Sequence, residues 1–289
     1  MSKIQENALV VEQQMLARQT YRLRLESPRI AGAALAGQFT MLRVGNGLDP
    51  LLRRPFSFHR VFPRDGVMEI LYRVVGRGTW QLSQYRPGTA LDLMGPLGNA
   101  FDIPREDAGP IVLVAGGIGI APLFELIGRL AADGVQDPST GIHLFYGART
   151  AAELLPPESF SDLGISVHWS TDDGSFGYRG YVTRLFQQFL EARAIRPAVV
   201  YACGPLAMQY RVAKWALLHR IPSQLSLESL MACGVGACLG CALPAPVPGD
   251  PSSDRYVHVC KDGPIFSAGS IQWHKIQLQP APPPMFPYS

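Results

Sequence analysis

Two different spacings of apolar residues divide the chain. From about residue 6 to residue 103, short segments of alternating apolar and polar residues are separated by Gly, Pro and Asp, as is typical of antiparallel strands. The segments span residues 21–26, 38–44, 67–75 and 90–94. This spacing predicts an antiparallel barrel or sandwich.

After Pro110 the pattern changes to continuous apolar strands that are each followed by a helical stretch. Strands are expected near 143–146, 167–169 and 199–202, and helices at 121–134, 181–193 and 205–219. Such alternation predicts a parallel α/β sheet with right-handed crossovers.

From about residue 226 a Cys- and Gly-rich loop with little periodicity follows, in which a bound metal is expected to replace a core. Residues 244–253 (PAPVPGDPSS) are expected to be a flexible insertion. The fold class is therefore predicted as α+β and multidomain. Its parts are an antiparallel β-barrel (1–105), a parallel α/β nucleotide-binding domain (106–225), a small cysteine-bearing subdomain (226–275) and a Pro-rich tail (276–289).

Composition narrows the possible partners and the cellular location. The 289 residues are 47% hydrophobic and 17% charged, which is typical of a folded protein. A net charge of +3 gives no electrostatic reason to expect nucleic acid or an anionic membrane as a partner. The N-terminal residues are too polar for a signal peptide, and no apolar run is long enough to span a bilayer. We therefore expect a cytoplasmic protein.

Four of the five cysteines lie close together in the sequence. Cys233, Cys238, Cys241 and Cys260 have the spacing C-x4-C-x2-C with a fourth Cys further on, which is the ligand spacing of plant-type [2Fe-2S] centres. The interleaved glycines allow the left-handed backbone that wraps such a cluster. Structural zinc and plain buried thiols are the alternatives, although zinc sites usually have two close Cys pairs and this sequence has one.

Two segments of the predicted barrel carry residues suited to a flavin. RRPFSF places Arg54, which can pair with a diphosphate, and Ser57, which can hydrogen-bond a flavin ring edge, on one strand. LYRVVGRGTWQLSQ supplies a strand, a Gly-x-Gly-Thr turn and a helix start at Thr79, where free amides can bind a diphosphate. An Arg and a Ser on a strand also commonly face solvent.

The segment VLVAGGIGIAP (112–122) runs from a strand through a Gly-rich turn into a helix, but its glycines do not form the G-x-G-x-x-G fingerprint. YACGP (201–205) ends the last expected strand, so Cys203 can either face a nicotinamide or be an ordinary buried side chain. Asp172 and Asp173 would repel a 2′-phosphate, whereas Arg149 would attract one. These residues leave NAD and NADP both open.

The order RPFS, then YRV, then GRGT resembles the FAD-binding barrel of the ferredoxin-NADP reductase superfamily, and the Gly-rich turn, YGAR (146–149) and TDDGSFGYRG (171–180) also resemble it. The resemblance implies that FAD is bound by Arg54, Pro55, Phe56, Ser57, Leu71, Tyr72, Arg73, Gly78 and Thr79. The same resemblance implies that a nicotinamide cofactor is bound by Gly116, Gly117, Gly119, Pro122, Arg149, Asp172, Gly204 and Pro205. Ser57 and Cys203 would lie beside the reacting rings, with Cys203 not acting as a covalent nucleophile.

The phrase SLESLMACGVGACLGC, followed by YVHVCKDGPIF, closely resembles the electron-transfer subunits of NAD-linked dihydroorotate dehydrogenases. That family implies FAD, a [2Fe-2S] cluster and NAD, and an FMN-containing catalytic subunit as partner in a heterotetramer. Electrons would then pass from FMN through the cluster and FAD to NAD in pyrimidine biosynthesis. Dihydroorotate itself would bind to the partner, and Glu228 would cap a turn or relay a proton.

Two other interpretations remain open at this point. The chain can be the reductase subunit of a ferredoxin-NAD(P) oxidoreductase, hydrogenase or oxygenase system. From a different class, it can be an iron-sulphur redox sensor, although a sensor would need neither a flavin segment nor a hydride site.

Overall fold

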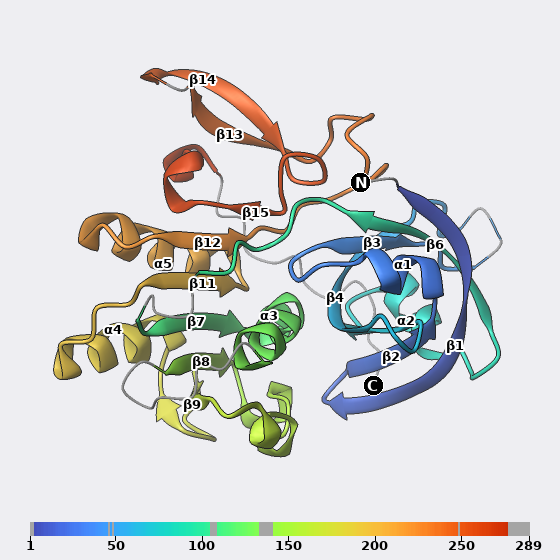
Figure 1. Ribbon diagram of the computed structural model, residues 1–289, viewed down its shortest axis with the longest axis horizontal. Helices are drawn as coiled ribbons and strands as arrows, with labels where there is room; N and C mark the ends of the chain where they lie inside the picture. The colour runs from blue at the N-terminus through green and yellow to red at the C-terminus, as the bar shows by residue number, and fades with distance from the viewer. Residues whose placement is uncertain are drawn as a thin grey trace.

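The computed structural model describes residues 3–45, 47, 49–104, 109–132, 141–247 and 249–276 of the chain. Figure 1 shows a barrel beside an open sheet, with a two-stranded hairpin lying above the sheet. None of the described helices has both the length and the apolar character needed to cross a bilayer.

The N-terminal part is a closed antiparallel barrel with strand order β1-β2-β5-β4-β3-β6. Its core consists of inward-facing residues such as Leu23, Phe58 and Ile70, each fully buried. Two short helices, α1 and α2, connect the strands. The elements are β1 (Ile4–Ala17), β2 (Thr20–Glu26), α1 (Pro28–Ala33), β3 (Phe39–Leu42), β4 (Arg54–Phe62), β5 (Val67–Arg73), α2 (Arg77–Ser83) and β6 (Ala90–Leu97).

The second part is a seven-stranded sheet with order β10-β9-β8-β7-β11-β12-β15. All neighbouring strands are parallel except β12 and β15, because β15 returns from the C-terminal segment in the opposite direction. The strands are β7 (Ile111–Gly116), β8 (Ile142–Ala148), β9 (Ser166–Thr171), β10 (Tyr178–Arg179), β11 (Val199–Cys203), β12 (Ser223–Ser226) and β15 (Ile265–Phe266). The helices and 3-10 turns are η1 (Gly117–Gly119), α3 (Ile120–Ala132), η2 (Ala151–Glu153), η3 (Pro157–Leu163), α4 (Val182–Arg193) and α5 (Leu206–His219).

Strand β7 is apolar along its whole length because helices cover both faces of the sheet. Val112 and Val114 point into a core shared with α4 and α5. Leu113 and Ala115 point into the opposite core, which is formed with α3. This two-sided burial explains why the sequence shows continuous apolar runs here rather than alternation.

Helix α3 joins the sheet to the barrel. The buried carboxylate of Glu125 accepts a hydrogen bond from the backbone N of Val61 in β4 at 2.9 Å and pairs with Arg129. The ring of His59 in β4 lies 4.4 Å from that of Phe124. The barrel strand that carries the RPFS sequence is therefore fixed against the helix that follows the Gly-rich turn.

The C-terminal segment corrects two sequence-based expectations. Residues 244–247 and 249–253 lie within a β-hairpin, formed by β13 (Ala242–Val247) and β14 (Asp250–His258), and are not a loose insertion, while residue 248 lies outside the described residues. Pro244 and Pro246 fit because a two-stranded sheet has free edges, where a missing amide breaks no ladder bond. The segment also shares the sheet's core through Val259, Phe266 and Trp273, so metal does not replace a core here. The C-terminal segment ends in the 3-10 turns η4 (Ala268–Ser270) and η5 (Trp273–Lys275). The predicted Pro-rich tail lies, from residue 277 onward, outside the described residues.

The predicted fold class is confirmed: a β-barrel and an α/β sheet are followed by a small C-terminal unit.

Candidate functional site: cysteine loop, barrel strand and glycine turn

The hairpin brings together two cysteines that are far apart in sequence. Cys241 immediately precedes β13 and Cys260 follows β14, and pairing of the strands places their sulphur atoms 3.3 Å apart. Burial, and then the contact with Cys241, raise the pKa of Cys260 to about 12. Two sulphurs this close repel each other as thiolates, so the pair suits a bound cationic centre that can compensate both charges.

Backbone amides of the loop point at the sulphur atoms of Cys233 and Cys260. Cys233 Sγ accepts hydrogen bonds from the amides of Val235, Ala237 and Cys238 at 3.3–3.4 Å. Burial alone would raise the pKa of Cys233, but these bonds and a contact with Cys238 lower it to about 6. The amide of Gly236, with φ of +81°, donates to Cys260 Sγ at 3.2 Å. Such amides stabilise thiolate ligands of a cluster.

The four sulphurs thus form two contacting pairs, Cys233 with Cys238 and Cys241 with Cys260. Among the described residues, no three His, Cys, Asp or Glu side chains gather around a single point suited to one metal ion. In a [2Fe-2S] centre each iron takes two protein ligands, and two thiolate pairs match that requirement.

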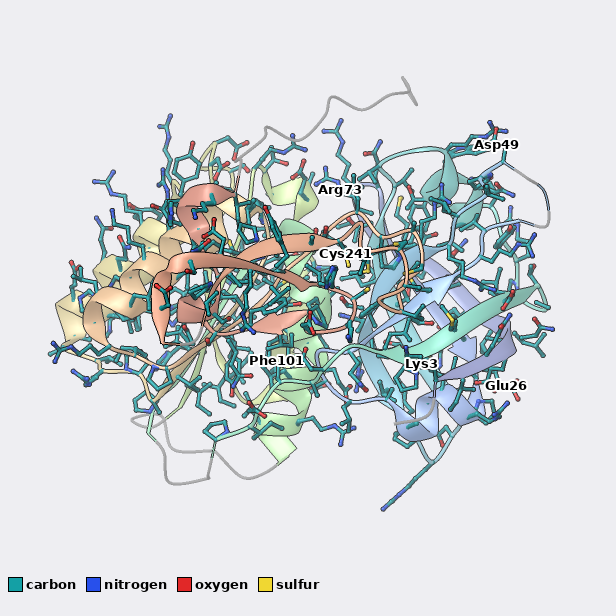
Figure 2. The ribbon with its side chains drawn as sticks, turned by 90° about the horizontal axis from the view of Figure 1, so that it is seen from above. Lys3, Glu26, Asp49, Arg73, Phe101 and Cys241 are labelled. Carbon is teal, nitrogen blue, oxygen red and sulfur yellow. The ribbon has the colours of Figure 1, made fainter. Side chains whose placement is uncertain are left out.

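The cysteine loop also contacts the barrel. A Cβ on Gly234 would lie 2.4 Å from Cγ of Met41 in β3, so the loop backbone packs directly on that side chain. Met41 is paired with Pro55 of the neighbouring strand β4, and Phe39 is paired with Ser57. Figure 2 shows Cys241 at the junction between the hairpin and the barrel. The loop is therefore one strand away from β4, the strand predicted to line the flavin.

The predicted flavin residues lie on β4, β5 and α2. Arg54, Pro55, Phe56 and Ser57 are the first four residues of β4 and are all half-buried. Arg54 lies against the first turn of α2, because a Cβ on Gly78 would be 2.8 Å from Nε of Arg54. Burial lowers the pKa of Arg54, and the charge of Asp49 opposes this.

Thr79 belongs to the same turn of α2. Its Oγ1 accepts hydrogen bonds from the amides of Val75 and Gly76 at 2.9 and 3.1 Å, so it caps the helix. The structure thus brings Arg54, Gly78 and Thr79 together in one place.

The last three side chains of strand β5 lie in three different environments. Leu71 enters the core below α3. Tyr72 is buried in the barrel, where its hydroxyl donates to Oε1 of Gln13 at 3.0 Å and its ring packs edge-on to Phe56. Arg73 leaves the barrel and pairs with Glu153 at 2.7 Å.

The predicted nucleotide residues meet where β7 and β11 end. A Cβ on Gly116 would lie 2.7 Å from Pro205, and one on Gly119 would lie 2.2 Å from the carbonyl oxygen of Cys203. Gly204 adopts φ of +151°, and a Cβ there would lie 2.9 Å from Cα of Gly116. The glycine turn and the Cys-Gly-Pro segment are therefore in direct backbone contact. Gly117 and Pro122 complete the passage into α3.

Cys203 is 1% exposed and belongs to the core that the sheet forms with α3. Burial and then the charge of Glu228 raise its pKa well above the ordinary value, against hydrogen bonds from Ser226 and Gly204. Glu228 has a solvent-exposed surface, but the surrounding protein desolvates its carboxylate, and this desolvation raises the pKa of Glu228. Within the described residues its carboxylate makes no turn-capping hydrogen bond, so the capping role expected of Glu228 is not observed.

Glu153 is a functional candidate that the sequence did not reveal. Its carboxylate, 8% exposed, pairs with both Arg73 and Arg149 at 2.7 Å. Burial would raise its pKa, but the hydrogen bonds and charges of the two arginines lower it to about 2. The residue is one turn beyond the YGAR sequence, and its i,i+4 spacing from Arg149 was the available signal.

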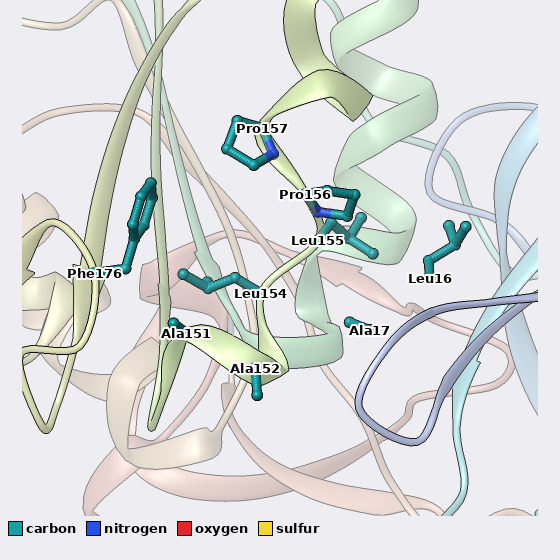
Figure 3. A pocket seen from close by; sticks show the side chains of 9 residues that line it. All are labelled: Leu16, Ala17, Ala151, Ala152, Leu154, Leu155, Pro156, Pro157 and Phe176. Atoms are coloured by element: carbon teal, nitrogen blue, oxygen red, sulfur yellow. The ribbon is translucent and has the colours of Figure 1, made fainter.

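A cavity of about 290 Å³ lies on the apolar side of η2, the turn that carries Glu153 (Figure 3). Its walls are apolar side chains from the end of β1, from the residues around η2 and from the loop after β9. They are Leu16, Ala17, Ala151, Ala152, Leu154, Leu155, Pro156, Pro157 and Phe176.

A closed antiparallel barrel, a nucleotide-type sheet and a C-terminal cysteine loop in this order define a pyridine-nucleotide reductase of the ferredoxin-NADP reductase class that is extended by an iron-sulphur unit. Residues 113–214 match the model of an oxidoreductase NAD-binding domain. Residues 228–272 match the iron-sulfur cluster binding domain of dihydroorotate dehydrogenase B.

The chain belongs to the family of electron transfer subunits of NAD(+)-linked dihydroorotate dehydrogenase B. The subunit from Desulforamulus reducens is 38% identical over 273 residues, which are 94% of this chain and 100% of that protein. The subunit from Bacillus caldolyticus is 40% identical over 270 residues, or 92% of this chain and 98% of that protein. The resemblance drawn from the sequence is confirmed.

Solved structures show the same architecture. An NADH-dependent reduced ferredoxin-NADP oxidoreductase matches with a TM-score of 0.79 and 28% identity, covering 92% of this chain and 90% of that chain. An Amycolatopsis cytochrome P450 reductase matches with a TM-score of 0.62 and 28% identity, covering 76% and 67%.

Proposed function

We propose that this chain passes electrons from the FMN of a dihydroorotate dehydrogenase catalytic subunit through a [2Fe-2S] cluster and FAD to NAD, as part of pyrimidine biosynthesis. The observation that carries the proposal is the position of the cysteine loop. The Cys241–Cys260 sulphur pair forms at the base of the hairpin, and the loop that carries Cys233 and Cys238 packs on Met41, one strand away from the RPFS segment. A cluster held there would be separated from the flavin strand by a single barrel strand.

The chain's own residues supply the binding sites. Cys233, Cys238, Cys241 and Cys260 would hold the cluster, and the loop amides would stabilise its negative charge. Arg54 and the first turn of α2, with Gly78 and Thr79, would hold the FAD diphosphate, while Pro55, Phe56, Ser57 and residues 71–73 would line the rest. When bound, FAD can exchange single electrons with the cluster and a hydride with NAD.

The nicotinamide dinucleotide would bind at the carboxyl edge of the sheet, where ligands of open α/β sheets bind. Gly116, Gly117, Gly119 and Pro122 would form its phosphate turn, and Gly204 with Pro205 would position the nicotinamide. Arg149 and Asp172 would lie near the adenosine ribose. Ser57 and Cys203 would approach the reacting rings, and because Cys203 is kept as a thiol by burial it would contribute shape rather than nucleophilic attack.

The proposal extends to domains, assembly and location. Residues 1–105 would bind FAD, 106–225 NAD and 226–275 the cluster. Two such chains would assemble with two catalytic subunits. A cytoplasmic location is supported by the five cysteines, none of which forms a disulfide, as is usual in a reducing compartment.

The test is dihydroorotate-dependent reduction of NAD by the chain reconstituted with its FMN-containing catalytic subunit. Replacing Cys238 by Ser should abolish this reaction, because the cluster loses a ligand. NADH oxidation by ferricyanide, which draws on the flavin, should persist. Ser270→Ala, at a turn of the same C-terminal segment, is the control and should retain both activities. Full dihydroorotate-dependent activity in C238S would refute the proposal.

A further inference from the structure

Five charged side chains gather beyond the ends of β8 and β9. Arg149 follows β8, and Asp172 and Asp173 follow β9; their backbones are joined because the amide of Asp173 donates to the carbonyl of Arg149 at 3.2 Å. Glu153 in η2 and Arg73 at the end of barrel strand β5 complete the group. Ser175 ties the two loops together, since its Oγ accepts from the amide of Ala151 and donates to Asp173.

Glu153 is the centre of this group. Its Oε1 accepts from Nη2 of Arg73 and from Nη2 of Arg149, both at 2.7 Å, and its Oε2 accepts from Nε of Arg149 at 3.3 Å. The Arg149 side chain is 70% exposed, yet two of its nitrogens are already bound to one carboxylate. Bidentate pairing of this kind is the strongest ion-pair geometry available to an arginine.

The surrounding charge reinforces this pairing. Asp172 lies within electrostatic range of Arg149, Asp173 and Glu153. Three carboxylates therefore face two arginines, and the group carries a net negative charge. In α/β dinucleotide sites an acidic residue near the ribose favours NAD, whereas a free Arg accommodates the 2′-phosphate of NADP.

We propose that Glu153 is a specificity-determining residue that makes the chain selective for NAD by withdrawing Arg149 from a 2′-phosphate. This inference rests on the proposed nicotinamide site. It assigns a role to a residue outside the glycine turn. It also resolves the conflict between Arg149 and the two aspartates, because Arg149 is present but already bound.

The test compares binding of 2′,5′-ADP with binding of 5′-AMP to the full chain by calorimetry, together with the KM for NADPH and NADH. Glu153→Gln keeps the shape of the side chain and removes its charge. A freed Arg149 should then improve the Kd for 2′,5′-ADP by about tenfold or more, since hydrogen bonds to charged groups have that magnitude. The Kd for 5′-AMP should change by less than about threefold, because no 2′-charge is involved.

Three further variants make the result specific. In the double variant E153Q/R149A the gain for 2′,5′-ADP should disappear. In R149A alone the ratio of the two affinities should equal that of the unmodified chain, because in the unmodified chain Glu153 already keeps Arg149 from a 2′-phosphate. This variant also tests the inference if E153Q does not fold. Glu158→Gln removes an exposed charge from the neighbouring turn η3 and should leave both affinities unchanged.

Unchanged 2′,5′-ADP binding in E153Q, or a gain that persists in E153Q/R149A, would overturn the inference. The inference would also be overturned if R149A alone bound 2′,5′-ADP more weakly, relative to 5′-AMP, than the unmodified chain does. Failure of the proposed function looks different, because NADH would then leave the flavin oxidised while the nucleotide-binding comparison would still report on Glu153.

Discussion

Gly119 offers the sharpest test of how the nucleotide site is built. A methyl group added at Gly119 would lie 2.2 Å from the carbonyl oxygen of Cys203, 2.4 Å from its carbonyl carbon and 2.6 Å from the backbone N of Gly204. All three are backbone atoms at the end of the buried strand β11, so rotating a side chain cannot relieve the overlap. Replacing Gly119 by Ala must therefore separate the glycine turn from the Cys-Gly-Pro segment.

The size of the effect follows from the overlap. Ordinary contacts begin at 3.4 Å, so the two segments must move apart by roughly 1 Å. Forcing an extra methyl into a packed interior costs about 1–3 kcal/mol, and the upper end applies because backbone must shift. A displacement of this size at a reacting centre can lower the rate by about 100-fold.

The assays are urea unfolding followed by circular dichroism and stopped-flow reduction of the flavin by NADH. Gly128→Ala is the matched control, because it lies in α3 and its added methyl meets no atom within 4 Å. It should raise helix stability by up to about 1 kcal/mol and leave the rate unchanged. If G119A unfolds at the same urea concentration as the unmodified chain and is reduced at the same rate, the two segments do not have the contact described.

Two further predictions concern acid stability and the cysteine loop. Burial, and then the nearby charges of His143 and Arg193, lower the pKa of His168 from 6.5 to about 4. The unfolded chain therefore takes up this proton first, and the free energy of unfolding should fall as pH drops from about 6.5 to about 4. H168Q should flatten that decline in urea titrations; an unchanged slope would contradict the assignment. Gly234→Ala should lower the iron content, because φ of +72° disfavours Ala and its methyl would meet Met41 at 2.4 Å. Gly240→Ala, whose methyl would lie 3.7 Å from Cys238 Sγ, should keep its iron; equal iron in both variants would refute the packing argument.

Much of the fold could be predicted because burial follows the backbone period. The helix expected at 181–193 is α4 (Val182–Arg193), and that expected at 205–219 is α5 (Leu206–His219). Strand β1 gave little signal, since only Ala8 and Val10 of its residues are buried. The barrel strand at 54–62 was found through its chemistry, not through alternation.

The remaining features depend on contacts between distant residues. The sequence predicts a loose insertion where the hairpin β13–β14 lies because Pro and Gly normally end strands, yet Gly249 adopts φ of +81° just before β14 and Pro244 and Pro246 occupy an open-edged sheet. The pairing of Cys241 with Cys260 follows from that hairpin. Glu153 could not be recognised as a link between the barrel and the nucleotide domain, because its partner Arg73 is 80 residues away.

The cofactor content of the purified chain decides whether it carries electrons as proposed, and it can be measured as iron, acid-labile sulphide and flavin, followed by anaerobic NADH titration in a visible spectrometer. We expect about two irons, about two sulphides and about one FAD per chain, with visible absorption that NADH bleaches. Zinc in place of iron, or a flavin that stays oxidised with excess NADH, would contradict this expectation.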